Sequence, residues 1–177
     1  MIKKILFVII GIVALLLLAA VFIKKDFHVE RQITIAKPKA DVFDYIKYLK
    51  NQDHFSKWAM MDPAMKKYYR GTDATPGFVS GWESQNKDLG KGEQEIKSIL
   101  PGERIDYELR FIEPFPSTNK AAFLTSAPDS SNTKVVWAFD GHMNYPMNLM
   151  LVVMNMDKMM GADLETGLTN LKRELEK

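Results

Sequence analysis

Apolar residues recur at the spacing of one helix face over the last part of the chain, residues 146–177. The stripe comprises eight residues, separated from one another by three or four positions: Leu149, Val153, Met156, Met160, Leu164, Leu168, Leu171 and Leu175. This period predicts one long helix with a single buried face. Seven of the chain's 11 Met residues lie between Met143 and Met160. Because Met fits irregular or variable shapes, the Met-rich half of the helix either fills the core or closes a ligand cavity.

An uninterrupted apolar run occupies the other end of the chain. Ile5–Ile23 contains no charged and no polar side chain, and a pair of lysines stands before it and after it. As a helix the run would be roughly 28 Å long, close to the hydrocarbon thickness of a bilayer, about 30 Å. We therefore expect residues 1–25 to form a transmembrane anchor and residues 26–177 to form one folded domain.

A cleaved secretory signal is the alternative interpretation of this run. The apolar part of a signal is usually about 7–15 residues long and ends in small residues. Here Leu18 occupies a position that a cut after Ala20 requires to be small. Two basic clusters compete to set the side of the membrane: the MIKK start favours a cytoplasmic N-terminus, and the basic residues that follow the run favour the opposite. We expect a single-pass membrane protein whose domain lies outside the cytoplasm.

The middle of the chain alternates between apolar and polar residues, as half-buried strands do. A first strand is expected over residues 29–35, and Pro38 then opens a helix. Asn51 is expected to cap a second, short helix over residues 51–58. The strands that follow are expected over residues 66–70, 78–83, 90–100, 104–111, 121–126 and 135–143.

This order of elements predicts an α+β fold: one strand, two short helices, about six strands and a long helix. Strands joined by tight turns such as Pro101-Gly102 form a curved antiparallel sheet. The last helix is long enough to cover the apolar face of that sheet. A curved sheet wrapped around one helix leaves space between the two.

Composition removes several classes of function. The chain has no Cys, which excludes disulfides, thiolate zinc sites and a Cys nucleophile. Its formal charge is +2, and removing the four lysines beside the apolar run changes the balance from 24 basic against 22 acidic residues to 20 against 22, that is −2. The basic surplus therefore flanks the anchor, and no basic patch indicates nucleic-acid binding.

Several stretches, in this order, resemble the START-like helix-grip (SRPBCC) superfamily, in particular its bacterial polyketide cyclase/dehydrase branch. The stretches are VERQITIAKPKADVFDYI, FSKW, GWESQNKDLGKGEQEI, PGERIDYEL, TKVVWAFDG and GADLETGLTNLKRELE. The resemblance covers about Val29–Lys177 and implies a helix-grip fold with a hydrophobic cavity between the sheet and the C-terminal helix. It does not imply one chemistry, because the fold hosts several.

The predicted ligand-binding residues are large aromatic side chains on inward-facing positions and the Met residues of the last helix. They are Trp58, Trp82, Tyr107, Phe111, Trp137, Phe139, Met154, Met156 and Met160. Core and cavity wall can be the same residues in such a fold. Two helix glycines receive separate interpretations: Gly167 is expected to allow close contact with the sheet, as the resemblance implies, and Gly161 to mark a bend.

Polar residues offer little chemistry. His28, His54 and His142 are scattered without obvious acidic partners, so no metal site and no cofactor are predicted. Glu93 and Glu95 share a strand face with Lys97 and are expected to form a solvated stripe.

The leading hypothesis for function is a membrane-held, non-catalytic binder of a hydrophobic small molecule or lipid. One alternative is a cyclase- or dehydratase-like enzyme, whose candidate acids and bases are Glu83, Tyr107 and His142. Another is an interaction module like the heat-shock ATPase activators, which would expose an apolar patch.

Overall fold

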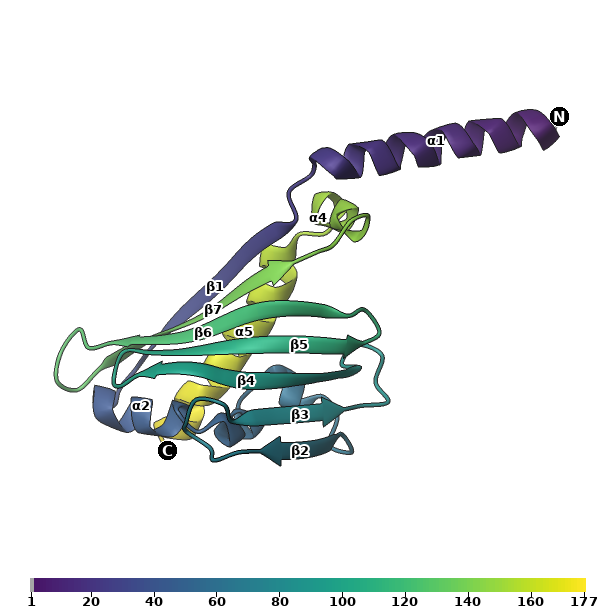
Figure 1. Cartoon of the computed structure of the whole chain (residues 1–177). Helices are drawn as coiled ribbons and strands as arrows, with labels where there is room; N and C mark the ends of the chain where they lie inside the picture. The colour runs from purple at the N-terminus through teal and green to yellow at the C-terminus, as the bar shows by residue number, and fades with distance from the viewer. Residues whose placement is uncertain (1) are drawn as a thin grey trace.

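A curved antiparallel sheet of seven strands dominates the computed structural model, which describes residues 2–177 (Figure 1). The strands are β1 (Asp26–Ile35), β2 (Lys66–Arg70), β3 (Val79–Glu83), β4 (Lys91–Leu100), β5 (Arg104–Glu113), β6 (Ser117–Ser126) and β7 (Thr133–His142). They lie in the order β1-β7-β6-β5-β4-β3-β2, so that the first strand pairs with the last. Together with the helices, this is the α+β helix-grip fold that the order of elements predicts.

The register of the strands decides which residues face the helices. Glu93, Gln94 and Ile96 on β4 lie opposite Arg110, Leu109 and Tyr107 on β5. Since successive side chains point to opposite faces, the row of Gln94 and Leu109 faces inward and the row of Glu93 and Arg110 faces outward. The alternation in the sequence therefore sets the two faces of the sheet.

The short helices after β1 differ from the prediction in their bounds. They are α2 (Lys39–Ile46), the 3₁₀ helix η1 (Leu49–His54) and α3 (Lys57–Met60). A single helix over residues 51–58 capped by Asn51 is wrong: Asn51 lies inside η1 and its Nδ2 donates to the Tyr45 carbonyl at 2.7 Å. The break between η1 and α3 places Phe55 in the core, where it has no exposed surface.

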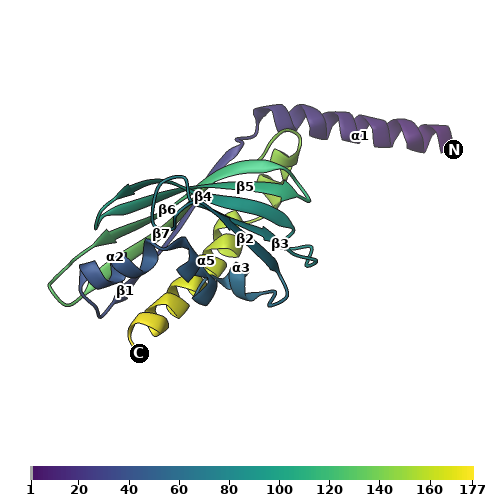
Figure 2. The same cartoon turned by 60° about the horizontal axis from the view of Figure 1, so that its bottom comes forward.

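The C-terminal helix α5 (Met156–Leu175) crosses the concave face of the sheet (Figure 2). One helix from residue 146 onward is also wrong, because the 3₁₀ helix η2 (Met147–Leu149) and the one-turn helix α4 (Met150–Val153) precede α5. Met154 is extended, and Asn155 caps α5 by accepting a hydrogen bond from the Lys158 N–H at 2.9 Å. The side chain of Asn155 competes with helix continuation, which the apolar period alone does not reveal.

Two glycines bring α5 close to the sheet. A Cβ on Gly167 would lie 2.6 Å from the Trp137 ring, and a Cβ on Gly161 would lie 2.0 Å from Arg31 Nη2. The helix α5 continues through Gly161, and a bend at this residue stays a prediction. The space is needed by the Arg31 guanidinium, which pairs with Asp157 at 2.9 Å.

The core lies between the second half of α5 and the sheet. Leu164, Leu168 and Leu171 are at most 1% exposed, whereas Met156 and Met160 are only partly buried. The rings of Phe123 and Trp137 lie 4.7 Å apart at the centre of this core. The helix is thus well packed where its inward residues are Leu and less tightly packed where they are Met.

Helix α1 (Ile2–Phe22) projects from the domain and is long and apolar enough to cross a membrane (Figure 1). Ala20 is its one buried residue among those that the structure describes. A membrane span and a signal sequence both fit a helix of this length and composition. The contacts between the end of α1 and the domain are described below.

Candidate functional site

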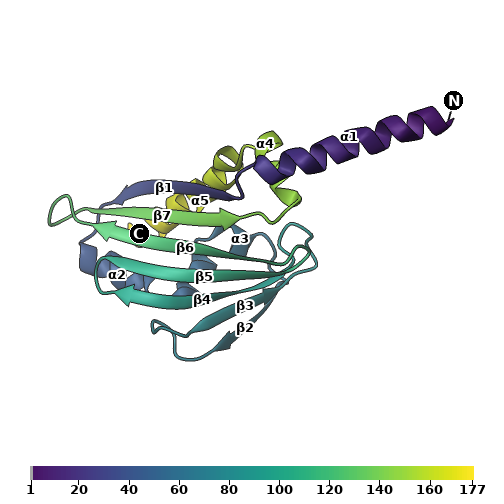
Figure 3. The same cartoon turned by 45° about the horizontal axis from the view of Figure 1, so that its top comes forward.

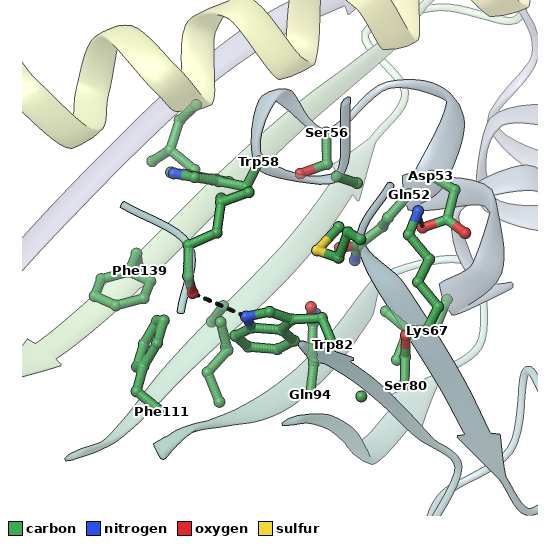
Figure 4. Close-up of a pocket in the computed structure, with 18 of the residues that line it drawn as sticks. Gln52, Asp53, Ser56, Trp58, Lys67, Ser80, Trp82, Gln94, Phe111 and Phe139 are labelled. Carbon is green, nitrogen blue, oxygen red and sulfur yellow. Dashed lines mark hydrogen bonds and ion pairs between the residues drawn. The ribbon is translucent and has the colours of Figure 1, made fainter. Parts of the chain in front are cut away.

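A cavity of about 210 Å³ opens between the inner face of the sheet, η1–α3 and the first half of α5 (Figure 4). Its wall is largely apolar. Strands supply ten of the 21 lining residues, Met160 and Leu164 of α5 close one side, and Leu49 and Trp58 come from the short helices.

Aromatic rings form one end of the cavity, where Figure 4 labels Phe111 and Phe139. Trp82 packs edge-on against Phe111 with ring centroids 5.8 Å apart. The Trp82 Nε1 donates to the Leu89 carbonyl at 3.0 Å, which satisfies its polar atom and orients the ring. A second edge-on pair, Trp58 and Trp137, lies beside them at 5.9 Å. The geometry suits an apolar or aromatic ligand body.

Polar side chains form the other end, which Figure 4 shows on the side of Gln52, Asp53 and Lys67. Lys67 Nζ pairs with Asp53 Oδ1 at 2.9 Å, and Tyr69 Oη donates to Asp53 Oδ2 at 3.0 Å. Burial, together with this hydrogen bond, raises the pKa of Tyr69 to about 12. Gln52 is 7% exposed, and within residues 2–177 its Nε2 has no hydrogen-bond partner. This nitrogen is enclosed beside Tyr107, so the polar groups that pair at this end of the cavity are those of Asp53 and Lys67.

The cavity wall includes six of the nine residues that the sequence predicts to bind a ligand. They are Trp58, Trp82, Phe111, Trp137, Phe139 and Met160. Met154 and Met156 line a separate, open groove between α4 and the chain that joins α1 to β1. The Met-rich stretch is thus divided between two places.

Tyr107 lies in the core behind the cavity wall. It is 1% exposed and packs edge-on against Phe123, with ring centroids 6.2 Å apart. Burial raises the pKa of its hydroxyl far above the usual value, and Gln52 beside it acts in the opposite direction. No hydrogen bond of acceptable geometry joins the two residues in the described chain. Tyr107 is therefore enclosed and protonated rather than poised for proton transfer.

The other candidate acids and bases also lie away from the cavity. Glu83 pairs with Lys91 at 3.6 Å, and His142 Nδ1 lies 2.6 Å from Asp26 Oδ1 at the edge of the sheet. His28 Nδ1 lies 2.7 Å from Asp140 Oδ1, which raises the pKa of His28. Two of the histidines thus have the acidic partners that the sequence did not suggest, because pairing β1 with β7 brings together residues more than 100 positions apart.

Seven polar residues of the wall were not predicted from the sequence: Gln52, Asp53, Ser56, Lys67, Ser80, Asp88 and Gln94. An inward position of Gln94 could have been predicted, because it lies two residues from the inward-facing Gly92 and Ile96 on the same strand. The positions of Asp53 and Lys67 could not, because their contact depends on how η1 packs against β2. Within residues 2–177 no group of three or more His, Asp or Glu side chains is placed to hold a metal ion.

The acidic stripe on β4 is not solvated as expected. The Glu93 side chain is 14% exposed and accepts hydrogen bonds from Tyr68, Arg70 and Arg110 at 2.8–3.2 Å. Its charged partners, Arg70 first, lower the pKa of Glu93 to about 2. This network lies on the outer face of the sheet, opposite the cavity, and belongs to the scaffold.

Comparison with known proteins identifies the family of the chain and other proteins that share its fold. Residues 26–176 match a family described as polyketide cyclase / dehydrase and lipid transport. No protein among those of curated function matches the chain. A protein from Thermus thermophilus shares the fold with a TM-score of 0.60 and 17% identity, over 84% of this chain and 97% of that one. A Thermobifida fusca protein is similar, with a TM-score of 0.58 and 17% identity over 84% and 92% of the two chains.

An enzyme of known reaction has the same fold. Norcoclaurine synthase from Thalictrum flavum, solved in complex with dopamine and hydroxybenzaldehyde, has a TM-score of 0.62 and 7% identity, over 85% of this chain and 86% of that one. At such identities these likenesses show the fold alone.

Proposed function

Because the chain belongs to the polyketide cyclase / dehydrase and lipid transport family over residues 26–176, we propose that it is a membrane-anchored protein that binds a hydrophobic small molecule or lipid. The binding site is the cavity between the sheet and α5. In this proposal the protein holds its ligand without transforming it, and no cofactor takes part.

The observation that carries the proposal is the chemistry of the cavity wall. Trp82, Phe111 and Phe139 form an apolar end, and the opposite end carries Gln52 and the ion pair of Asp53 with Lys67. The fitting ligand is therefore amphipathic, with an apolar body and a polar group near Asp53 and Lys67.

The size of the cavity limits the ligand further. Its volume of about 210 Å³ is below the range of about 300–1,000 Å³ that is common for pockets of drug-sized ligands. A larger molecule would need Met65 and Met160 to change rotamer, which Met does readily. Met at these two positions supports binding of ligands that vary in shape.

The arrangement of charges favours binding over catalysis. Glu83, Tyr107 and His142, the candidate acids and bases, do not line the cavity. Asp53 and Lys67 do reach it, but they engage each other at 2.9 Å. An enzyme such as norcoclaurine synthase shares the fold, and the corresponding alternative here would depend on this ion pair.

Contacts at the end of α1 support retention of the anchor. Asn148 Nδ2 donates to the carbonyls of Ala20 at 2.7 Å and Ile23 at 3.0 Å, so the last turn of α1 is built into the domain. We propose a single-pass protein whose domain lies outside the cytoplasm. The intact mass of the mature protein tests retention: a chain that starts after Ala20 would contradict it.

Two matched variants test the cavity. The full chain in nanodiscs is titrated with 1-anilinonaphthalene-8-sulfonate, against empty nanodiscs as background. Met160→Ala removes a wall residue, whereas Met156→Ala removes the Met one turn earlier that lines the other groove. At about 0.8 kcal/mol per buried methylene, the Kd should change by roughly fourfold for each lost methylene contact in Met160→Ala and remain that of the parent in Met156→Ala. Equal Kd values for the parent and both variants would show that the cavity is not the site.

A further inference from the structure

The segment that joins β7 to α5 exposes apolar side chains beside the end of α1 (Figure 3). Val152 is 67% exposed and Val153 77%, and neighbouring residues add to the same surface: Tyr145, Met147 and Met150. A water-facing loop is usually polar, so a cluster of exposed apolar residues on η2 and α4 marks a contact surface. We call residues 145–153 the apolar segment.

The apolar segment is attached to α1 by specific hydrogen bonds. Asn148 has no exposed surface, and its Nδ2 donates to two carbonyls in the last turn of α1 and just beyond it, those of Ala20 and Ile23. The Met143 N–H donates to the Lys25 carbonyl at 2.8 Å. The last carbonyls of a helix have no partner within the helix, and leaving one unpaired is costly near a bilayer core. Asn148 therefore serves as a cap supplied from 125 residues away in the sequence.

The position of this contact along α1 determines the depth of the apolar segment. At 1.5 Å per residue, Ala20 lies about 3 Å from the helix end at Phe22. If α1 spans the membrane, a segment that touches Ala20 lies where the hydrocarbon core meets the headgroups. Lys24 and Lys25 follow at the level of the headgroups, which the charged ends of lysines near a helix terminus reach. The apolar surface of α1 and that of the apolar segment are thus continuous.

From this geometry we propose that the apolar segment is a second membrane contact, inserted into the interfacial layer of the bilayer that holds α1. The occupant of the surface is lipid, because the surface continues directly from a helix whose own side chains face lipid. The inference rests on the proposed anchor. It adds that the domain is held at two points and so has a fixed orientation on the membrane.

This orientation places the ligand cavity close to the membrane. Met156 in the first turn of α5 lines the groove beside the apolar segment, and Met160 one turn later lines the cavity. A hydrophobic ligand that leaves the bilayer at the apolar segment would therefore be separated from the cavity by one turn of α5.

Single cysteines test the insertion, since the chain has none of its own. Val153→Cys, Val13→Cys and Ser130→Cys are each labelled with bimane in the full chain and placed in phosphatidylcholine vesicles that carry doxyl lipids. Val13 lies within α1, and Ser130 lies in the β6–β7 turn at the far end of the sheet (Figure 1). Interfacial helices bury their apolar face about 5–10 Å deep, so the label at 153 should lose about half of its emission to a doxyl group at carbon 5 and less to one at carbon 12. The label at 13 should show the deeper pattern, and the label at 130 no quenching.

The outcomes separate this inference from the proposed function. A quenched label at 13 with an unquenched label at 153 overturns the inference and leaves the anchor in place. A label at 153 that is shielded from aqueous iodide as well as from doxyl lipid shows a protein partner, such as a second copy, and also overturns it. If neither 13 nor 153 is quenched, anchor and insertion both fail, whereas ligand binding in the cavity is decided by the Met160→Ala titration.

Discussion

Individual residues of α5 show how closely the helix meets the sheet. Gly167 faces the buried ring of Trp137, and Gly161 faces the guanidinium at the end of the long Arg31 side chain. The same substitution at both positions therefore meets a rigid neighbour in one case and a flexible one in the other. Trp137 also lines the cavity, so that Gly167 supports the site through packing.

Gly167→Ala is expected to destabilise the protein, and Gly161→Ala to be close to neutral. At Gly167 the new methyl group overlaps a ring that cannot move freely, which costs roughly 1–3 kcal/mol and outweighs the gain of about 1 kcal/mol in helix propensity. At Gly161 the Arg31 guanidinium can swing away, at the loss of its pair with Asp157. Thermal unfolding of the full chain in detergent measures both variants. Equal effects of the two substitutions would contradict the difference in packing.

One row of residues on the outer face of the sheet links strands β2, β3, β4 and β5. In the register of β2, β3, β4 and β5, this row contains Tyr68, Gly81, Glu93 and Arg110. A Cβ on Gly81 would lie 2.1 Å from the Tyr68 ring. The missing side chain lets Tyr68 cross β3 and donate its hydroxyl to Glu93 Oε1 at 2.8 Å. The network therefore joins the short edge strand β2 to the centre of the sheet.

Stability should depend on acid pH through Glu93. Its pKa is about 2 in the folded protein, below the ordinary value of 4.5, so the folded state binds the proton less readily than the unfolded state does. The contribution is complete above about pH 4.5 and is lost as the pH falls from there towards about 2. Glu93→Gln should be less stable than the parent at neutral pH and should lose less stability on acidification. Urea midpoints at about pH 5 and about pH 2.5 measure this.

Glu103→Gln is the matched control, because Glu103 is exposed and makes no ion pair within residues 2–177. It should keep the acid sensitivity of the parent. If Glu93→Gln loses as much stability between the two pH values as Glu103→Gln does, the outer network is not the source of the effect.

The whole molecule combines a domain with a helix that is attached to it at more than one point. Besides the chain connection, Asn148 and the apolar segment hold the end of α1. Removing the anchor therefore does more than shorten the chain. It removes the acceptors of a buried amide and leaves the exposed apolar surface around Met150 and Val153 without its neighbouring helix.

Residues 26–177 alone should fold but self-associate. The sheet, α5 and the core are complete without α1, and about 150 residues suffice for one domain. The apolar segment would then lack its covering and pair with other copies. Far-UV circular dichroism tests folding, and sedimentation velocity tests association. Replacing Val152 and Val153 by Glu should restore the monomer, whereas Ser130→Glu should not. A monomeric truncated chain without substitutions would show that the apolar segment needs no covering.

The sequence by itself determined the elements whose apolar period is long or strict. The alternation in β5 and β7, the Leu stripe of α5 and the apolar run of α1 each follow from local spacing, because burial of one face repeats at the period of the backbone. The family resemblance rested on stretches of β5, β7 and α5, together with others within Val29–Lys177, and did not include α1. Four of the predicted wall residues, Trp82, Phe111, Trp137 and Phe139, share the cavity for the same reason, since their inward parity could be counted along each strand. The other two, Trp58 and Met160, lie on helices.

Only the tertiary structure decided the features that depend on distant pairs. The break before α5 follows from Asn155 and from the contact of Asn148 with α1, and the local apolar period continues across it unchanged. The division of Met156 and Met160 between a groove and the cavity, and the pairing of Asp53 with Lys67, arise from how separate elements pack. Side-chain period is a property of neighbours in the chain, whereas the cavity and the apolar surface beside α1 are made by residues that only folding brings together.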